Sequence, residues 1–134
     1  MNHDDACPNI FPALKYQNAA KAIEFLVAAF GFKTEAVHAD EGETIAHAEL
    51  RLGPGAVMLG SDRKNPENPW DGVRMGIYVH VADIDAHYAQ AKAAGARIVR
   101  PLADTDYGSR EYSAYDCEGN LWSFGTYRPA VAAQ

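Results

Sequence analysis

The order of elements expected in the first half of the chain recurs in its second half. Asn18 to Gly31 reads NAAKAIEFLVAAFG, and Ala82 to Gly95 reads ADIDAHYAQAKAAG. Each stretch begins with polar residues that can cap a helix, continues for about three turns and stops at a glycine. A short apolar segment precedes each helix, and three strand-like segments follow it. The sequence therefore predicts an α+β fold of two βαβββ modules that form a cleft.

Proline, glycine and polar clusters give the expected boundaries along the chain. The segment DRKNPENPWDG has two prolines and no hydrophobic periodicity, which is typical of a connection between modules. We expect a flexible N-terminal arm at 1–8, module one at about 9–61, a linker at 62–72, module two at about 73–128 and a tail at 129–134. Strands are expected at 10–16, 32–39, 44–52, 56–61, 74–81, 97–102, 109–116 and 121–127.

Composition excludes several classes of function. The net charge is −6 and the lysines and arginines are not clustered, which argues against a nucleic-acid partner. No apolar run approaches the roughly 20 residues of a membrane-spanning helix, and MNHDDACPN does not resemble a secretory signal, so we expect no membrane association. Cys7 and Cys117 are too few for a disulfide framework. Two free thiols are typical of a cytoplasmic protein, which is the expected location.

The N-terminal arm contains one candidate metal site. The amine of Met1, two backbone amides and the imidazole of His3 can hold Cu(II) in a square plane. The alternative is an arm in which His3 binds nothing, and the sequence leaves this open.

Alternation of side chains along the strands predicts which residues face the cleft. In 44–52, Ala46, Ala48 and Leu50 are expected to pack on a helix, so that His47 and Glu49 face the other way. The alternative is that these polar residues form an exposed strand face with cross-strand pairs. The complete set expected to bind a ligand is Phe11, His47, Glu49, Leu59, Trp70, Tyr78, His80, Tyr107 and Ser123.

Two other strands follow the same logic. In 56–61, Val57, Leu59 and Ser61 are expected on the open face. In the last strand, Trp122 and Phe124 are expected to cover a helix, which leaves Ser123 on the concave side. Trp70, in the linker, either packs over the cleft or anchors its own loop.

Four segments of the chain resemble the glyoxalase/bleomycin-resistance family of the vicinal oxygen chelate superfamily. They are AAKAIEFLVAAFGF, HAELRLGPGAVML, VADIDAHYAQAKAAGARI and YGSREYSAYDCEGNLWSFGTY. The last is similar to the segment that closes many members, although Cys117 stands where proline is usual. The resemblance covers about 9–128 and implies a single vicinal-oxygen-chelate-type domain that forms a homodimer.

The resemblance also implies where a catalytic metal would be bound. Enzymes of the family hold a divalent ion with one residue from each of four strands, and these places fall on Phe11, Leu59, Gly76 and Ser123. None of these supplies an imidazole, carboxylate, amide or thiolate donor, so we expect no metal and no cofactor. A different ligand set of His47, Glu49 and His80 stays open as an alternative.

Three functions are compatible with this pattern. The leading one is a metal-free binding protein that sequesters a bulky aromatic or cationic compound, such as an antibiotic, without turnover. The alternative is a metal-independent isomerase or lyase with His47 and Glu49 as acid–base pair and Tyr78 or His80 as acid or electrophile. A metal-dependent glyoxalase or dioxygenase is the third and is disfavoured by the missing ligands. Whether the protein is an enzyme is therefore left open.

The closing motif contains Arg110 and Glu111, which invite a catalytic interpretation. An arginine beside a tight turn more often fixes the loop by bonding carbonyls or a carboxylate such as Asp106. We therefore expect Arg110 to be structural, with Tyr107 able to reach the mouth of the pocket.

Overall fold

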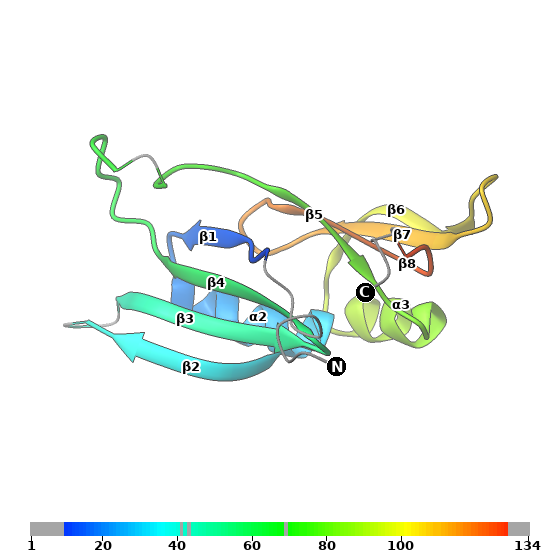
Figure 1. Cartoon of the computed structure of the whole chain (residues 1–134), viewed down its shortest axis with the longest axis horizontal. Helices are drawn as coiled ribbons and strands as arrows, with labels where there is room; N and C mark the ends of the chain where they lie inside the picture. The colour runs from blue at the N-terminus through cyan, green and yellow to red at the C-terminus, as the bar shows by residue number, and fades with distance from the viewer. Residues whose placement is uncertain (1–9, 41, 43, 69, 129–134) are drawn as a thin grey trace, which may run out of the picture. The chain divides into compact units, whose positions relative to one another are not determined.

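The computed structural model describes residues 10–40, 42, 44–68 and 70–128. The expected arm, with its His3 site, and the expected tail lie outside these residues. The described chain has two four-stranded sheets and two helices, which confirms the predicted α+β class (Figure 1). The internal contacts of the described residues define two units, one made of residues 10–23 with Phe32–Val73, the other of Glu24–Gly31 with residues 74–128.

Both helices begin and end as predicted. Asn18 caps α2 (Ala19–Phe30), because its Oδ1 accepts from the Lys21 amide at 3.1 Å, and Gly31 ends it at φ 84°. Asp83 caps α3 (Ile84–Ala93) by accepting from the Ala86 amide at 3.2 Å. None of the helices in the described part is long and apolar enough to cross a membrane.

The first unit contains a mixed sheet with the order β1-β4-β3-β2 (Figure 1). β1 runs parallel to β4, and the other neighbours are antiparallel. The core of this sheet is formed by buried apolar residues such as Leu14, Leu50 and Leu59. The strands are β1 (Ala13–Tyr16), β2 (Lys33–Ala39), β3 (Ile45–Leu52) and β4 (Gly55–Ser61).

Two expectations for this sheet are wrong. Ala46 does not pack on a helix: the β2–β3 register shifts between His38 and Ala39, so Ile45 is buried and Ala46 exposed. Leu59 does not face outward either, because it pairs with Ala48 on the buried face and is 3% exposed. The same register buries Val57 and Ser61. β4 is apolar on both faces, so polarity alone did not indicate which face is covered.

The second unit repeats the strand order of the first, as β5-β8-β7-β6. Again the first strand is parallel to the last, and the remaining pairs are antiparallel. This correspondence agrees with the duplication seen in the sequence. The strands are β5 (Gly76–His80), β6 (Arg97–Asp104), β7 (Arg110–Tyr115) and β8 (Leu121–Gly125).

Aromatic side chains form the core of the second unit. The ring of Phe30, at the end of α2, lies 5.5 Å from Trp122 and 4.8 Å from Phe124, measured between centroids. Both β8 residues are fully buried, which confirms that they cover a helix. His87 of α3 joins this core: its Nε2 donates to the Phe30 carbonyl at 2.8 Å, and its Nδ1 accepts from the Tyr112 hydroxyl at 2.7 Å.

The turn between β7 and β8 is organised by one buried carboxylate. Oδ1 of Asp116 accepts from the amides of Glu118 and Asn120, and Oδ2 accepts from the indole Nε1 of Trp122 at 3.0 Å. Asn120 in turn accepts from the Met75 amide at 2.9 Å. The turn, the first residues of β8 and the chain entering β5 are therefore held together by one polar network.

Candidate functional site

The open face of the second sheet carries a hollow of about 710 Å³. This face is the one opposite Trp122 and Phe124. We call the hollow the tyrosine hollow, after the three tyrosines among its five lining residues. These residues are Tyr78, Tyr107, Glu111, Ser123 and Tyr127.

Strand register explains why the three lining residues on strands, Tyr78, Glu111 and Ser123, share a face. Tyr78 of β5 pairs with Ser123 of β8, and Glu111 of β7 pairs with Gly125. Paired residues point to the same side of a sheet, and residues two apart on one strand do so as well. Three strands therefore contribute one lining residue each to a single face.

The tyrosine rings are close to one another and exposed. The ring of Tyr127 lies 6.5 Å from that of Tyr78 and 6.1 Å from that of Tyr107, between centroids, and is perpendicular to the latter. Their exposed fractions are 37% for Tyr78, 61% for Tyr107 and 48% for Tyr127. Clustered exposed aromatic side chains are a feature of binding surfaces.

Glu111 is the charged group of the tyrosine hollow. The Tyr107 hydroxyl donates to its Oε1 at 2.9 Å, and this bond raises the pKa of Tyr107. The pKa of Tyr78 is raised by burial first and by the charge of Glu111 second, while its hydroxyl donates to the Tyr127 carbonyl. Both phenols are therefore neutral near pH 7 and act as hydrogen-bond donors.

Gly125 allows the carboxylate side chain to pack against the sheet. A Cβ at this position would lie 2.5 Å from Cγ of Glu111 and 2.8 Å from Oη of Tyr78. Such distances are much shorter than van der Waals contact. A side chain at position 125 would therefore displace Glu111 and Tyr78.

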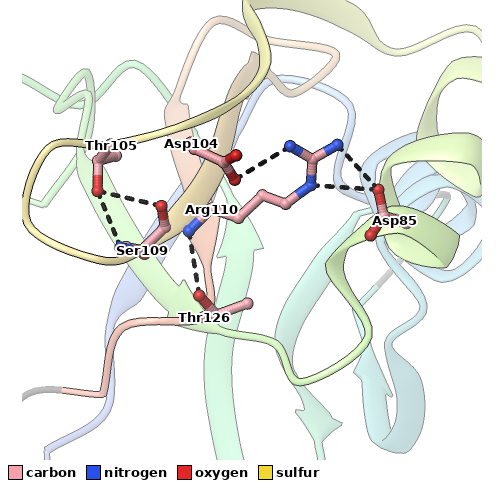
Figure 2. Close-up of polar contacts among 6 residues, drawn as sticks. All are labelled: Asp85, Asp104, Thr105, Ser109, Arg110 and Thr126. Atoms are coloured by element: carbon pink, nitrogen blue, oxygen red, sulfur yellow. Dashed lines mark hydrogen bonds and ion pairs between the residues drawn. The ribbon is translucent and has the colours of Figure 1, made fainter.

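Arg110 holds the strands beside this site (Figure 2). Its guanidinium bonds to Asp85 of α3 and to Asp104 of β6, each at 3.1 Å, and its amide donates to Oγ1 of Thr126. Asp85 and Asp104 raise the pKa of Arg110. These contacts are those of a structural residue, although the partners are Asp85 and Asp104 rather than the predicted Asp106.

The loop that carries Tyr107 is closed by the hydroxyl group of Thr105. Oγ1 of Thr105 accepts from the Ser109 amide at 3.0 Å and donates to the Ser109 carbonyl at 3.1 Å (Figure 2). Gly108 allows the turn by adopting φ 88°. Tyr107 is thus presented from a fixed turn.

The first unit has a smaller hollow, of about 110 Å³. His47 and Trp70 are among its lining residues, with Lys15 and Met58 on the open sides of β1 and β4. Nε2 of His47 lies 2.8 Å from Oε2 of Glu49, so the predicted acid–base pair is in hydrogen-bonding contact. The complete lining is Ala13, Leu14, Lys15, Ala46, His47, Met58, Leu59, Gly60 and Trp70.

The nine residues predicted to bind a ligand therefore have different positions. Tyr78, Tyr107 and Ser123 lie together in the tyrosine hollow. His47, Trp70 and the largely buried Leu59 border the smaller hollow, and Glu49 is hydrogen-bonded to His47. Phe11 is 41% exposed and lines neither hollow. His80 also lines neither, and its buried Nδ1 has no hydrogen-bond partner among the described residues.

Sequence reasoning missed Glu111 and Tyr127. The sequence interpretation places Glu111 only in the closing motif, yet Glu111 alternates with the buried Tyr112 and so belongs on the open face with Ser113. That alternation was a usable signal. Tyr127 lies beyond the end of β8, where period-two reasoning gives no direction.

The residues present do not fit the metal of the related enzymes. Of the four places implied by the resemblance, Phe11, Leu59 and Gly76 carry no donor atom, and Ser123 offers only a hydroxyl already bonded to Oγ of Ser113 at 2.7 Å. Within the described ranges there is also no group of three or more His, Cys, Asp or Glu residues that could hold an ion. The chemistry of this site is that of aromatic, hydroxyl and carboxylate groups.

Residues 12–124 match the family model described as the Glyoxalase/Bleomycin resistance protein/Dioxygenase superfamily. The chain belongs to this superfamily. The match spans both strand-helix repeats, in agreement with the resemblance found in the sequence.

Individual proteins are similar to this chain over most of its length. The uncharacterized protein Rv0887c of Mycobacterium tuberculosis is 33% identical over 126 residues, which are 88% of this chain and 74% of that protein. The crystal structure of TioX from Micromonospora sp. ML1 is 34% identical, with a TM-score of 0.77, over 88% of this chain and 97% of that one. A glyoxalase/bleomycin resistance protein from Streptomyces sp. CB03234 is 20% identical, with a TM-score of 0.66, over 87% and 98%, and shares the fold.

Proposed function

We propose that the protein binds a bulky aromatic or cationic small molecule and sequesters it without chemical turnover. The observation that carries this proposal is the tyrosine hollow, in which three exposed aromatic rings surround one carboxylate. Sites for small molecules commonly combine aromatic walls with a few polar groups that fix orientation. The hollow has this composition, and its volume of about 710 Å³ is sufficient for a drug-sized compound.

Two substitutions in different units test this assignment. A panel of aromatic compounds, including the cationic dye ethidium and the antibiotic bleomycin, is titrated by calorimetry against the protein. Tyr107→Ala is expected to weaken binding at least tenfold, and Trp70→Ala, an exposed aromatic of the first unit, is expected to leave it unchanged. The reverse result would move the ligand to the smaller hollow. Conversion of a bound compound into a new product would show that the protein is an enzyme.

A second candidate function rests on the contact between His47 and Glu49. A histidine whose ring is bonded to a carboxylate can act as a general base, which suits a metal-independent isomerase or lyase. The test is exchange of the proton next to the carbonyl of a ketone panel in D₂O, followed by NMR. Exchange that disappears in His47→Ala would favour this function, and no exchange would remove it.

The homodimer is proposed on the basis of the family, and the cytoplasmic location on the basis of the cysteine content of the chain. We propose that the protein is a homodimer located in the cytoplasm, with neither nucleic acid nor membrane as partner. We propose further that its sequestration of the ligand confers antibiotic resistance. Sedimentation at micromolar concentration tests the dimer, and cell fractionation tests the location. A monomer in sedimentation would contradict the first of these.

A further inference from the structure

We propose that the ligand group bound in the tyrosine hollow is an organic monocation of the alkylammonium type, held by the rings of Tyr78, Tyr107 and Tyr127 with Glu111 as its counter-charge. This inference rests on the proposed small-molecule function and specifies the chemistry of its ligand. It also makes Glu111 the residue that selects for charge.

The first argument is the charge of the lining. Among the five lining residues Glu111 alone is charged at neutral pH, and none is a lysine or an arginine. The Tyr107 hydroxyl bonds to one carboxylate oxygen and does not neutralise it. A negative group beside partly desolvated aromatic walls favours a positive ligand over a neutral one of the same shape.

The second argument is the geometry of the rings. A cation is attracted to an aromatic face when it lies within about 6 Å of the ring centroid. The Tyr127 centroid lies 6.1 Å from that of Tyr107 and 6.5 Å from that of Tyr78, so one ammonium group can be within this range of several rings. The hydrogen bonds of the Tyr78 hydroxyl to the Tyr127 carbonyl and of the Tyr107 hydroxyl to Glu111 keep these two rings in place.

Two arginines of the neighbouring strands, Arg110 and Arg100, do not line the tyrosine hollow. Arg110 is engaged by Asp85 and Asp104. Arg100 lines a separate hollow of about 290 Å³ that shares Tyr107 and Glu111 with the tyrosine hollow. The charge of Arg100 lowers the pKa of Tyr107, but the hydrogen bond to Glu111 has the larger effect and raises it. Neither arginine is among the residues that line the tyrosine hollow.

An ammonium with methyl or other small alkyl groups fits these observations better than a metal ion. Its charge is spread over apolar substituents, so it loses less hydration on entering an aromatic site. A divalent metal would need several oxygen or nitrogen donors, and one carboxylate does not supply them.

The test uses two compounds that differ only in charge. 4-(Hydroxymethyl)phenyltrimethylammonium and 4-tert-butylbenzyl alcohol have the same shape, with the quaternary nitrogen of the first replaced by carbon in the second. Binding of each to the full chain is followed by ¹H–¹⁵N NMR up to 10 mM. We expect the cation to bind at least tenfold more tightly, and this preference to fall when NaCl is raised from 20 to 300 mM.

Two variants locate the source of the preference. Glu111→Gln keeps the size of the side chain and is expected to reduce the affinity for the cation at least fivefold, with the affinity for the alcohol changed less than twofold. Glu118→Gln removes the same charge from the same unit, outside the hollow, and is expected to change neither affinity. The thermal midpoint of each variant shows whether the fold is retained.

The outcomes separate the two proposals. Equal affinity for both compounds, with shifts at the tyrosines, would overturn the cation preference and leave the binding function standing. A preference that survives Glu111→Gln would overturn the role of Glu111. No binding of either compound would overturn the proposal for this hollow, and the broader binding function would then depend on the result of the aromatic panel.

Discussion

The α-carbon of Gly125 faces the side chain of Glu111 so closely that a Cβ built there would lie 2.5 Å from Cγ of Glu111. The same Cβ would lie 2.8 Å from Oη of Tyr78. The two residues are direct partners in the β7–β8 ladder, so Glu111 cannot avoid this contact by a small change of register. The sheet thus has a glycine, Gly125 of β8, at the place where the side chain of Glu111 lies against that strand.

The first prediction follows from this contact. Gly125→Ala is expected to displace Glu111 and Tyr78, to destabilise the protein by about 1–3 kcal/mol and to weaken ligand binding at least tenfold. Gly76→Ala is the matched control, because a Cβ at Gly76, on the same sheet, would have its nearest contact at 4.0 Å, to the Leu121 carbonyl. Urea unfolding and the ligand titration measure both effects. Unchanged affinity in Gly125→Ala would mean that the ligand does not use the position of Glu111.

The second prediction concerns the buried carboxylate of Asp116. Asp116→Asn replaces an acceptor oxygen by an amide donor, which then faces the amides of the turn or the indole of Trp122. We expect a loss of about 3 kcal/mol in the free energy of unfolding, because buried donors lose a charged acceptor. Asp106→Asn, at an exposed carboxylate, is expected to cost less than about 0.5 kcal/mol. Equal urea midpoints for the two variants would contradict the structural role of Asp116.

The sequence was sufficient to predict the fold because the duplication, the helix-capping residues and the glycines all indicate the same order of helices and strands. Asn18 and Asp83 cap the helices, and Gly31 takes the positive φ that ends the first one. The faces of β3 and β4 were harder to predict. A bulge at Ala46 reverses the alternation, and β4 has apolar residues on both sides, so its covered face is decided by the pairing of Leu59 with Ala48.

The candidate site was predictable only where strand periodicity applies. Tyr78 and Ser123 lie on the open face as expected, because Ser123 alternates with the buried Trp122 and Phe124 and Tyr78 is its partner on β5. Tyr107 and Tyr127 lie outside strands, and their approach to the hollow depends on the turn closed by Thr105 and on the chain after β8. Such positions are determined by loop geometry, which a single sequence does not specify.

The third prediction is that Arg110 has no part in binding. Arg110→Met removes its bonds to Asp85 and Asp104, and we expect the thermal midpoint to fall slightly at low salt while ligand affinity is retained. The difference in midpoint from wild type should become smaller in 0.5 M NaCl, because exposed ion pairs are screened. Calorimetric titration with a compound that binds the wild type measures affinity. A tenfold loss of affinity in a folded Arg110→Met variant would place the arginine at the ligand.

The fourth prediction concerns His47 and Glu49. The double substitution His47→Ala with Glu49→Ala is expected to leave the fold intact, because both side chains are on the open face of β3 and bond to each other. If the ligand is in the tyrosine hollow, its affinity should also be unchanged, and if the first unit contributes, affinity should fall. Circular dichroism and titration distinguish these results. Loss of folded structure would show that the pair is structural.

The last prediction is a pH dependence of stability that comes from His87. Burial lowers the pKa of His87 from its ordinary value, because it disfavours the charged imidazolium, and the hydrogen bond from Nε2 to the Phe30 carbonyl offsets this effect only in part. The unfolded chain therefore takes up a proton at a higher pH than the folded one. This contribution to stability is complete above about pH 6.5 and is lost as the pH falls below that value toward the lower pKa of the folded state. Urea unfolding at pH 7.5 and 5.5 should show a larger loss for the wild type than for His87→Gln, whereas His38→Gln, at an exposed histidine, should behave like the wild type. An equal loss in wild type and His87→Gln would mean that other groups cause the dependence.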